Sequence, residues 1–287
     1  MVVCHLHIVS LKPGVSVASF LHNLRQNGAK PVFQARVLRW MILPRKMSTG
    51  HLLGRNIHWD VLLGLEGDGS IPASSQADIA AIWTASSGVS ARALSGYGEL
   101  NATLLNPLRG SVQPAELPDH SSSTSDSSEN LELSPEWVQW IEALPWSVRE
   151  HPVSMLNLLA FHPCKKDQYK QYGAEFSKRA GSRHGGHVKL VGRVLGSQAG
   201  ADGWEEIAYV HYPSVRHFAA MAGSEDYQAV NKQYRLGALK DTFILCCQEI
   251  NSDGELAGAA EPGKSKLQGS AVNIRKTNKI IVHTLIH

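Results

Sequence analysis

Two short segments of the N-terminal half each place two titratable side chains two residues apart. His5 and His7 form one pair, and His58 and Asp60 form the other. Side chains two residues apart share one face of a strand, so pairing the two segments would gather all four in one pocket. Histidine titrates near neutral pH and an aspartate can fix its tautomer, which suits general acid–base catalysis. We predict His58, Asp60, His7 and His5 as catalytic residues facing a lumen. Substrate hydrogen bonding, metal binding and a structural role are the alternatives.

A second set of polar side chains interrupts apolar segments of the C-terminal half. Asn157 lies within an apolar run, and an amide buried there must find a backbone or ligand partner. Lys189 and Arg193 share one face of a segment, where they either meet a substrate or solubilise an outer surface. Arg36 and Arg39 fall on opposite faces of one segment, and each is a candidate anion clamp for a substrate. The helical tyrosines either contact substrate or pack on the sheet. The predicted substrate-binding residues are Asn157, Tyr209, His211, Arg39, Arg193 and Tyr172.

Signatures of the common cofactors are absent from the sequence. There is no G-x-G-x-x-G, P-loop, Cys-x-x-Cys, H-E-x-x-H or G-x-S-x-G pattern. This disfavours nicotinamide, ATP, zinc and serine-hydrolase mechanisms, so we predict no cofactor and no metal. The cysteines lack zinc spacing and read as reduced, buried thiols of a cytosolic protein. They are Cys4, Cys164, Cys246 and Cys247.

The elements that position these residues are clearest between Pro152 and Cys247. Apolar runs over 152–161, 187–195, 204–212 and 241–247 read as strands, with helices after the first and third. The resulting order is β-α-β-β-α-β.

The N-terminal half has a similar order, written less clearly. We expect a strand over 2–10, a helix from the Ser16 cap to Gly28, and strands over 31–43 and 57–65. A second helix is expected over 76–83. The fourth strand is expected between Tyr97 and Leu105, although 91–105 is also compatible with a helix.

Composition divides the 287 residues into four parts. Residues 113–134 are rich in serine and proline and cannot bury a core, and Ser134-Pro135 then opens a helix over 135–144. A last strand over 279–286 is conceivable. The predicted parts are an N-terminal unit (1–110), a Ser-rich linker (111–134), a C-terminal unit (135–250) and a flexible tail (251–287).

Charge and hydropathy indicate a soluble globular protein. Hydrophobic residues make up 43% and charged residues 18%, and the net charge of +3 is too small to favour nucleic acid or an acidic membrane. No segment approaches the ~20 apolar residues of a membrane span. The N-terminus reads as a strand and not as a signal peptide. We therefore predict a cytoplasmic protein whose partner is a hydrophobic small-molecule substrate.

The second half resembles the dimeric α/β-barrel superfamily, and within it a branch of largely uncharacterised domains. The features that carry the likeness are Leu156-Asn157-Leu158, Tyr169 and Tyr172, Gly185-Gly186, Tyr212-Pro213-Ser214, and Ser224, Tyr227 and Arg235. The first half resembles the superfamily in element order alone. The resemblance implies an α+β fold in which two tandem ferredoxin-like units form an internal pseudo-dimeric barrel, as a monomer or as a homodimer.

The superfamily includes cofactor-free monooxygenases, haem-degrading enzymes, polyketide-tailoring cyclases and decarboxylases, and stress proteins, so the fold does not name the reaction. The leading prediction is a cofactor-independent enzyme that tailors a polyketide or terpenoid in secondary metabolism. Its reaction would be a cyclisation, isomerisation or decarboxylation, with a Diels-Alder-type closure compatible. One alternative is a cofactor-free or haem-linked monooxygenase, with His22 and His217 as the helical histidines. Another is a non-enzymatic binding or stress protein.

Overall fold

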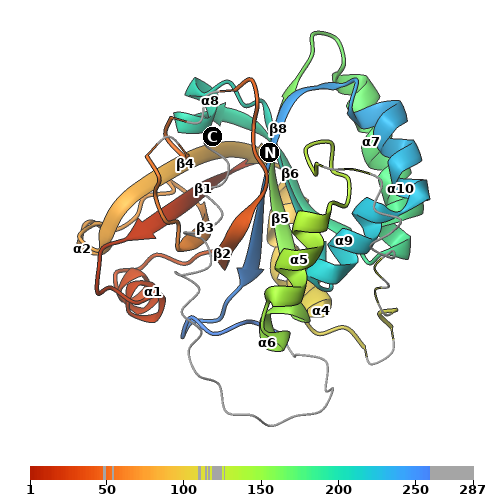
Figure 1. Cartoon of the computed structure of the whole chain (residues 1–287). Coiled ribbons are helices and arrows are strands. Elements are labelled where there is room, and N and C mark those ends of the chain that lie inside the picture. The colour runs from red at the N-terminus through yellow and green to blue at the C-terminus, as the bar shows by residue number, and fades with distance from the viewer. Residues whose placement is uncertain are drawn as a thin grey trace.

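The computed structural model describes residues 1–47, 50–53, 55–108, 111–113, 115, 117, 125 and 127–258. In it, antiparallel strands close into one barrel in the order β1-β3-β2-β8-β5-β7-β6-β4 (Figure 1). Every strand has two partners, so the barrel has no open edge. The strands are β1 (Val2–Leu11), β2 (Phe33–Ile42), β3 (Val61–Glu66), β4 (Ile79–Val89), β5 (Val153–Phe161), β6 (His187–Gly196), β7 (Glu206–Tyr212) and β8 (Leu239–Glu249).

The two halves of the barrel repeat one strand order. The first four strands lie in the order β4-β1-β3-β2, and the last four lie in the order β8-β5-β7-β6. The halves meet along two seams, where β2 pairs with β8 and β4 pairs with β6. The barrel is therefore closed within one chain.

Helices lie outside the strands and at one end of the barrel. Figure 1 shows α7, α9 and α10 together on one side and α1 on the other. The helices of the first half are α1 (Val17–Gln26), α2 (Ala73–Gln76), α3 (Ala91–Ser95) and α4 (Tyr97–Leu105). Those of the second half are α5 (Pro135–Ala143), α6 (Trp146–Arg149), α7 (Lys166–Phe176), α8 (Ser197–Ala201), α9 (Val215–Gly223) and α10 (Glu225–Val230), with π-helical turns η2 (Ser177–Gly181) and η3 (Asn231–Arg235).

Two helix starts form through the capping residues that the sequence predicts. The Ser16 hydroxyl accepts a hydrogen bond from the backbone N–H of Ser19 at 3.1 Å. The Ser134 hydroxyl accepts one from Trp137 at 3.4 Å, with Pro135 at the first helical position. Both caps satisfy amides that a helix N-terminus would otherwise leave unpaired.

Apolar side chains fill the barrel interior. Leu6, Trp83, Leu158, Tyr209 and Phe243 all belong to the interior cluster and come from five different strands. Alternate side chains of the same strands point outward and pack under the helices.

The predicted helix over 76–83 is wrong. Residues 79–89 form β4, which pairs with β1 along its whole length, and only the short α2 precedes it. The region from Tyr97 to Leu105 is helical, as the alternative prediction had it. The alanine-rich start of β4 has no strong local preference, so pairing with β1 decides its conformation.

Described residues at the end of the predicted linker and at the start of the predicted tail are packed. Leu131 and Leu133 are buried, and the Ser128 and Ser134 hydroxyls share a hydrogen bond of 2.5 Å. Ala257 donates a backbone hydrogen bond to Glu249 at 2.9 Å. Most of the serine run, and the strand predicted over 279–286, lie outside the described residues.

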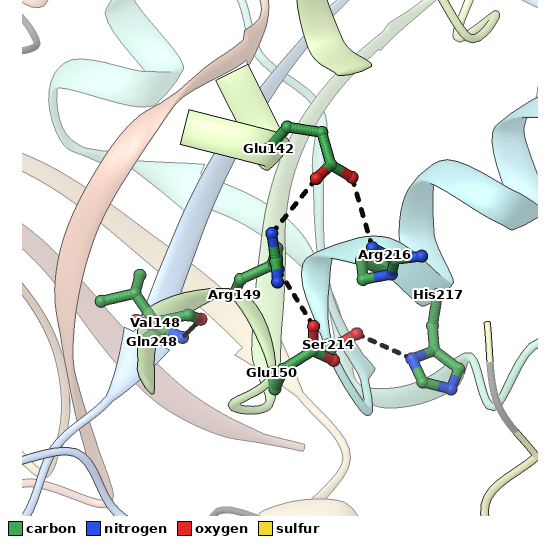
Figure 2. A network of polar contacts seen from close by, with 8 residues as sticks. All are labelled: Glu142, Val148, Arg149, Glu150, Ser214, Arg216, His217 and Gln248. Atoms are coloured by element: carbon green, nitrogen blue, oxygen red, sulfur yellow. Dashed lines mark hydrogen bonds and ion pairs between the residues drawn. The ribbon is translucent and has the colours of Figure 1, made fainter. Parts of the chain in front are cut away.

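A polar network fastens three helices to the barrel (Figure 2). The Glu142 carboxylate accepts hydrogen bonds from Arg149 at 3.2 Å and from Arg216 at 3.3 Å, which joins α5, α6 and α9. Gln248 of β8 donates its side-chain amide to the Val148 carbonyl at 2.7 Å. Partly exposed ion pairs stabilise little, so the network mainly fixes where these helices lie.

The cysteines are free, and Cys164 is exposed whereas Cys4, Cys246 and Cys247 are buried. Among the described residues, no helix combines the length and the apolar character that crossing a bilayer requires.

Candidate functional site

The β1 histidines lie outside the barrel, so the prediction that they face the lumen is wrong. Cys4, Leu6 and Ile8 occupy the interior instead, because apolar side chains are the ones that gain most from burial there. His7 is buried, and its Nε2 pairs with the Gly69 carbonyl at 2.8 Å. His5 Nδ1 pairs with the Ser86 hydroxyl at 3.0 Å. These contacts account for one ring nitrogen of each histidine, and the buried Nδ1 of His7 has no hydrogen-bond partner.

His58 and Asp60 come before β3 and not within it. His58 Nε2 lies 3.4 Å from one Asp60 oxygen, and the other oxygen accepts the backbone N–H of Leu11 at 2.8 Å. The carboxylate therefore holds the end of β1. No described hydrogen bond or ion pair joins this pair to the β1 histidines, so the expected four-residue pocket is not assembled. Its catalytic role stays a prediction.

Two of the predicted substrate-binding arginines also lie outside. Arg39 is buried against α5, where it pairs with Glu136 at 2.7 Å and stacks over the Trp140 ring at 4.8 Å. Arg193 is exposed on β6. Neither points into the interior, so the anion clamp expected there is not formed by them.

Asn157 and Tyr172 both lie on the outer side of the second half. The Asn157 amide donates to the backbone carbonyls of Met155 at 3.0 Å and Ala208 at 3.3 Å. Tyr172, on α7, shares a hydroxyl contact of 3.3 Å with Tyr227. The helix layer covers this face, so both residues are separated from the barrel interior by the sheet.

Tyr209 and His211 share one face of β7, and this face points into the barrel interior. The Tyr209 ring is fully buried and stacks on Phe33 with 4.8 Å between centroids. His211 is 2% exposed, and its Nδ1 has no hydrogen-bond partner. Burial, aided by the Lys189 charge, lowers the His211 pKa to about 3, so the ring is neutral at ordinary pH.

The centre of the interior polar site is an ion pair between Lys189 and Glu249. The Lys189 ammonium donates to Glu249 and, at 2.9 Å, to Asn101. Glu249 also accepts from Tyr97 at 2.8 Å and from Asn101 at 2.5 Å. β5 and β7 separate β6 from β8 around the barrel, so this pair crosses the interior. We call Lys189, Glu249, Tyr97, Asn101 and Tyr209 the luminal polar group.

Burial controls the protonation of this group. The Lys189 side chain is fully buried, which lowers its pKa, while the neighbouring Glu249 charge opposes that shift. Burial and then the Glu249 charge raise the pKa of Tyr97 well above its usual value. Burial raises the Tyr209 pKa in the same way. Both phenols are therefore neutral hydrogen-bond donors, and Lys189 lies over their rings at 5.5 and 4.8 Å.

A cleft of about 320 Å³ reaches this group from the surface. Its wall is partly apolar, and it includes Asn101 and Glu249, the two residues whose side chains contact Lys189. Arg25 at its rim is held by the Ser252 carbonyl at 3.0 Å and the Gln34 amide oxygen at 2.9 Å. A small, largely apolar molecule fits such a site. The lining includes Phe33, Leu105, Ile250, Asn101, Glu249 and Arg25.

This arrangement can move protons and polarise a carbonyl. A carboxylate that borders the cleft can remove an acidic C–H or O–H proton. Phenol and ammonium donors, desolvated by the barrel, can stabilise the oxyanion that results. The group therefore suits enolisation and related steps.

Sequence reasoning missed Glu249, Tyr97 and Asn101. Lys189 interrupts an apolar strand, but the sequence placed it on one face with Arg193, and solubilising an outer sheet explained both. The register shift between Val188 and Leu190 separates them, so Lys189 is buried and Arg193 is exposed. Glu249 follows the apolar run that ends β8, and its partner Asn101 is 148 residues away. Only barrel closure brings the two together.

The histidines considered for haem do not form an axial site. His22 is exposed on α1. His217 uses both ring nitrogens, with the Ser214 hydroxyl at 2.8 Å and the Gln113 carbonyl at 2.9 Å. In the described part of the chain, no three His, Cys, Asp or Glu side chains gather as metal ligands would. The residues present do not fit a haem group.

No family model and no curated protein matches the chain. Among solved structures, a protein of unknown function from Rhodopseudomonas palustris is similar at 25% identity and a TM-score of 0.31, covering 40% of this chain and 94% of that one. A candidate monooxygenase from Lactobacillus acidophilus NCFM is similar at 5% identity and 0.42, covering 90% and 97%. An anthrone oxidase-like protein is similar at 10% identity and 0.39, covering 90% and 96%. At these scores the likenesses assign no reaction to this chain.

Proposed function

We propose that the protein is a cofactor-independent enzyme that tailors a hydrophobic polyketide or terpenoid by cyclisation, isomerisation or decarboxylation. The observation that carries the proposal is the buried Lys189–Glu249 pair, which crosses the barrel interior and borders a cleft. A purely structural pair of this kind needs no access to a cleft. The repeated strand order supports the further proposal that the halves are two ferredoxin-like units acting as an internal pseudo-dimer.

Proton transfer through Glu249 is the step that the geometry supports best. The substrate carbonyl accepts a hydrogen bond from the third N–H of Lys189, which neither Glu249 nor Asn101 accepts, or from Tyr97 once its hydroxyl has turned away from Glu249. Glu249 removes the proton from the adjacent carbon. The enolate that forms is stabilised by the same donors. Glu249 then returns the proton to another carbon, or the enolate attacks an internal electrophile and closes a ring. A Diels-Alder-type closure would use the donors alone to polarise the carbonyl.

A cofactor-free monooxygenase would use the same base. Glu249 would deprotonate a phenol or quinol, and the electron-rich anion would then react with O₂. The two reactions differ in oxygen demand, so one experiment separates them.

The test is incubation of the purified full chain with extracts rich in polyketides and terpenoids, with and without O₂. Mass spectrometry follows each compound, and an electrode follows oxygen. Isomer formation or loss of CO₂ that continues without O₂ supports the proposal. Turnover that requires O₂ supports the monooxygenase instead. Ligand-induced stabilisation without any turnover would contradict both and leave a binding protein.

A further inference from the structure

Arg235 is a buried cation without a counter-ion. The residue is 2% exposed, and its Nη2 has no hydrogen-bond partner. Its Nη1 lies 3.5 Å from the Asn231 amide oxygen, and the guanidinium also hydrogen-bonds to the Tyr169 hydroxyl, which carries no charge. No carboxylate of the described residues lies within 4.0 Å of the guanidinium, and the nearby Glu206 pairs with Lys166 at 2.8 Å. A buried charge is normally paired, so this one requires an explanation.

Phenols surround Arg235 but do not neutralise it. The Tyr169 hydroxyl faces the guanidinium, and Tyr172 and Tyr227 lie within electrostatic reach. Burial raises the pKa of all three tyrosines, so they stay protonated. They therefore supply hydrogen-bond donors to whatever anion pairs with Arg235, and not the anion itself.

Solvent reaches the sheet beside this cluster. Asn157 is partly exposed, although Met155 and Leu159, which share its strand face, are buried. Met155 packs in the same cluster as Tyr172, and Leu159 packs with Tyr169, so Asn157 lies beneath α7 between the two rings. Tyr169 and Tyr172 are themselves partly exposed. Asn157, Tyr169 and Tyr172 therefore keep part of their surface accessible to solvent among buried neighbours.

The helices on either side carry local irregularities. α7 continues into η2, and α10 continues into η3, which ends at Arg235. Such π-helical turns occur frequently at functional sites because they re-aim side chains within a helix. A Cβ added at Gly173, on the flank of the tyrosine stripe of α7, would meet no atom within 4 Å.

We propose that the space between α7, η3 and β5 is a second binding site, distinct from the barrel interior, for a small carboxylate with a flat or aromatic body. The carboxylate pairs with the free edge of Arg235, and the Tyr169 and Tyr172 hydroxyls donate to its oxygens. The rings of the same tyrosines contact the body of the ligand. The sheet separates this site from the luminal polar group, so the proposal does not rest on the proposed function.

The test uses benzoate and its neutral isostere benzamide as probes, with binding measured by titration calorimetry at fixed ionic strength on the full chain. Wild-type protein should bind benzoate at least tenfold more tightly than benzamide. Arg235→Met should lose at least tenfold in benzoate affinity. The same variant, without ligand, should be as stable as wild type or more stable, because it removes an unpaired buried charge.

Three variants serve as controls. Arg39→Met removes a buried arginine that is paired with Glu136, so it should lower stability and leave benzoate affinity within twofold. The double variant Lys189→Met with Glu249→Leu removes the luminal ion pair without leaving an unpaired buried charge, and it should also leave benzoate affinity within twofold. Tyr172→Phe keeps the ring and should weaken benzoate severalfold, which tests the site even if Arg235→Met does not fold.

Three results would overturn the second site. The first is equal affinity for benzoate and benzamide. The second is unchanged benzoate affinity in Tyr172→Phe, when Arg235→Met is also unchanged or does not fold. The third is loss of benzoate binding in the folded double variant Lys189→Met with Glu249→Leu. The last would place the probe in the barrel interior.

Discussion

At the scale of single residues, the molecule depends on how buried charges are paired. Glu249 satisfies Lys189, Tyr97 and Asn101 at once, and Lys189 has Asn101 as its other hydrogen-bond acceptor. Arg39 is paired and Arg235 is not. The contrast indicates which buried cations belong to the architecture and which await a ligand.

Glu249→Gln should destabilise the fold by about 3–5 kcal/mol, because it leaves Lys189 buried without a counter-charge. The measurement is urea unfolding at neutral pH. The double variant Lys189→Met with Glu249→Leu should recover most of the loss, since it removes both charges together. A single variant as stable as wild type would show that the pair is not buried as described.

Two buried histidines should make stability depend on pH. Burial lowers the pKa of His7 to about 4 and that of His211 to about 3, whereas each titrates near 6.5 when unfolded. Below pH 6.5 the unfolded chain binds protons that the folded chain does not, so stability falls as pH decreases towards 4. Each histidine contributes a slope of about 1.4 kcal/mol per pH unit.

His211→Gln should therefore reduce the slope of unfolding free energy against pH by about 1.4 kcal/mol per pH unit, the contribution of one histidine. Urea unfolding series between pH 6 and 4.5 measure this slope. His22→Gln, at an exposed position of α1, is the matched control and should leave the slope unchanged. Equal slopes in wild type and His211→Gln would contradict the buried, neutral ring.

At the scale of elements, one carboxylate fixes the loop that follows β2. Asp241, in β8, accepts backbone N–H groups from Arg45 at 3.0 Å, Lys46 at 2.5 Å and Met47 at 2.7 Å. The same carboxylate also accepts a hydrogen bond from the backbone N–H of Thr242 at 2.9 Å. The loop is thus tied to the strand across the seam between the halves.

Asp241→Ala should cost about 2–3 kcal/mol, because these part-buried amides lose a charged acceptor. Asp253→Ala, at an exposed position, should stay within about 0.5 kcal/mol of wild type. Thermal and urea unfolding measure both variants. A change of less than about 1 kcal/mol in Asp241→Ala would mean that the loop does not depend on this anchor.

The sequence predicts the C-terminal elements better than the N-terminal ones. Apolar runs bounded by proline or glycine located β5, β6 and β7 within two residues. β4 was misread because its Ala-rich start has no local preference until β1 pairs with it. Strand alternation correctly paired Tyr209 with His211, but it could not say which face of β1 is interior. That choice depends on which faces the closed barrel turns inward.

At the scale of the whole molecule, the barrel is one cooperative unit. The interior cluster takes side chains from both halves, and two strand seams join them. Neither half can bury its interior face alone. Local contacts could not predict this, because closure joins residues that are far apart in sequence.

Unfolding should accordingly be a single transition. Far-ultraviolet circular dichroism and tryptophan fluorescence should give coincident urea curves, since interior Trp83 and outer Trp137 belong to different halves. Separate transitions would show that the halves fold independently.

The central claim is that Glu249 does the chemistry at the end of the cleft. Its most direct test compares compounds consumed from metabolite extracts by wild type, by Glu249→Gln, and by a His58→Ala, Asp60→Asn double variant, each verified as folded. We expect Glu249→Gln to lose at least about 100-fold in the rate of consumption. If Glu249 carries the proton, the double variant should stay within about threefold, because its side chains lie outside the luminal polar group. A loss in the double variant with activity retained in Glu249→Gln would support the His58–Asp60 prediction instead. Consumption that is equal in wild type and Glu249→Gln, or absent in wild type, would contradict the account.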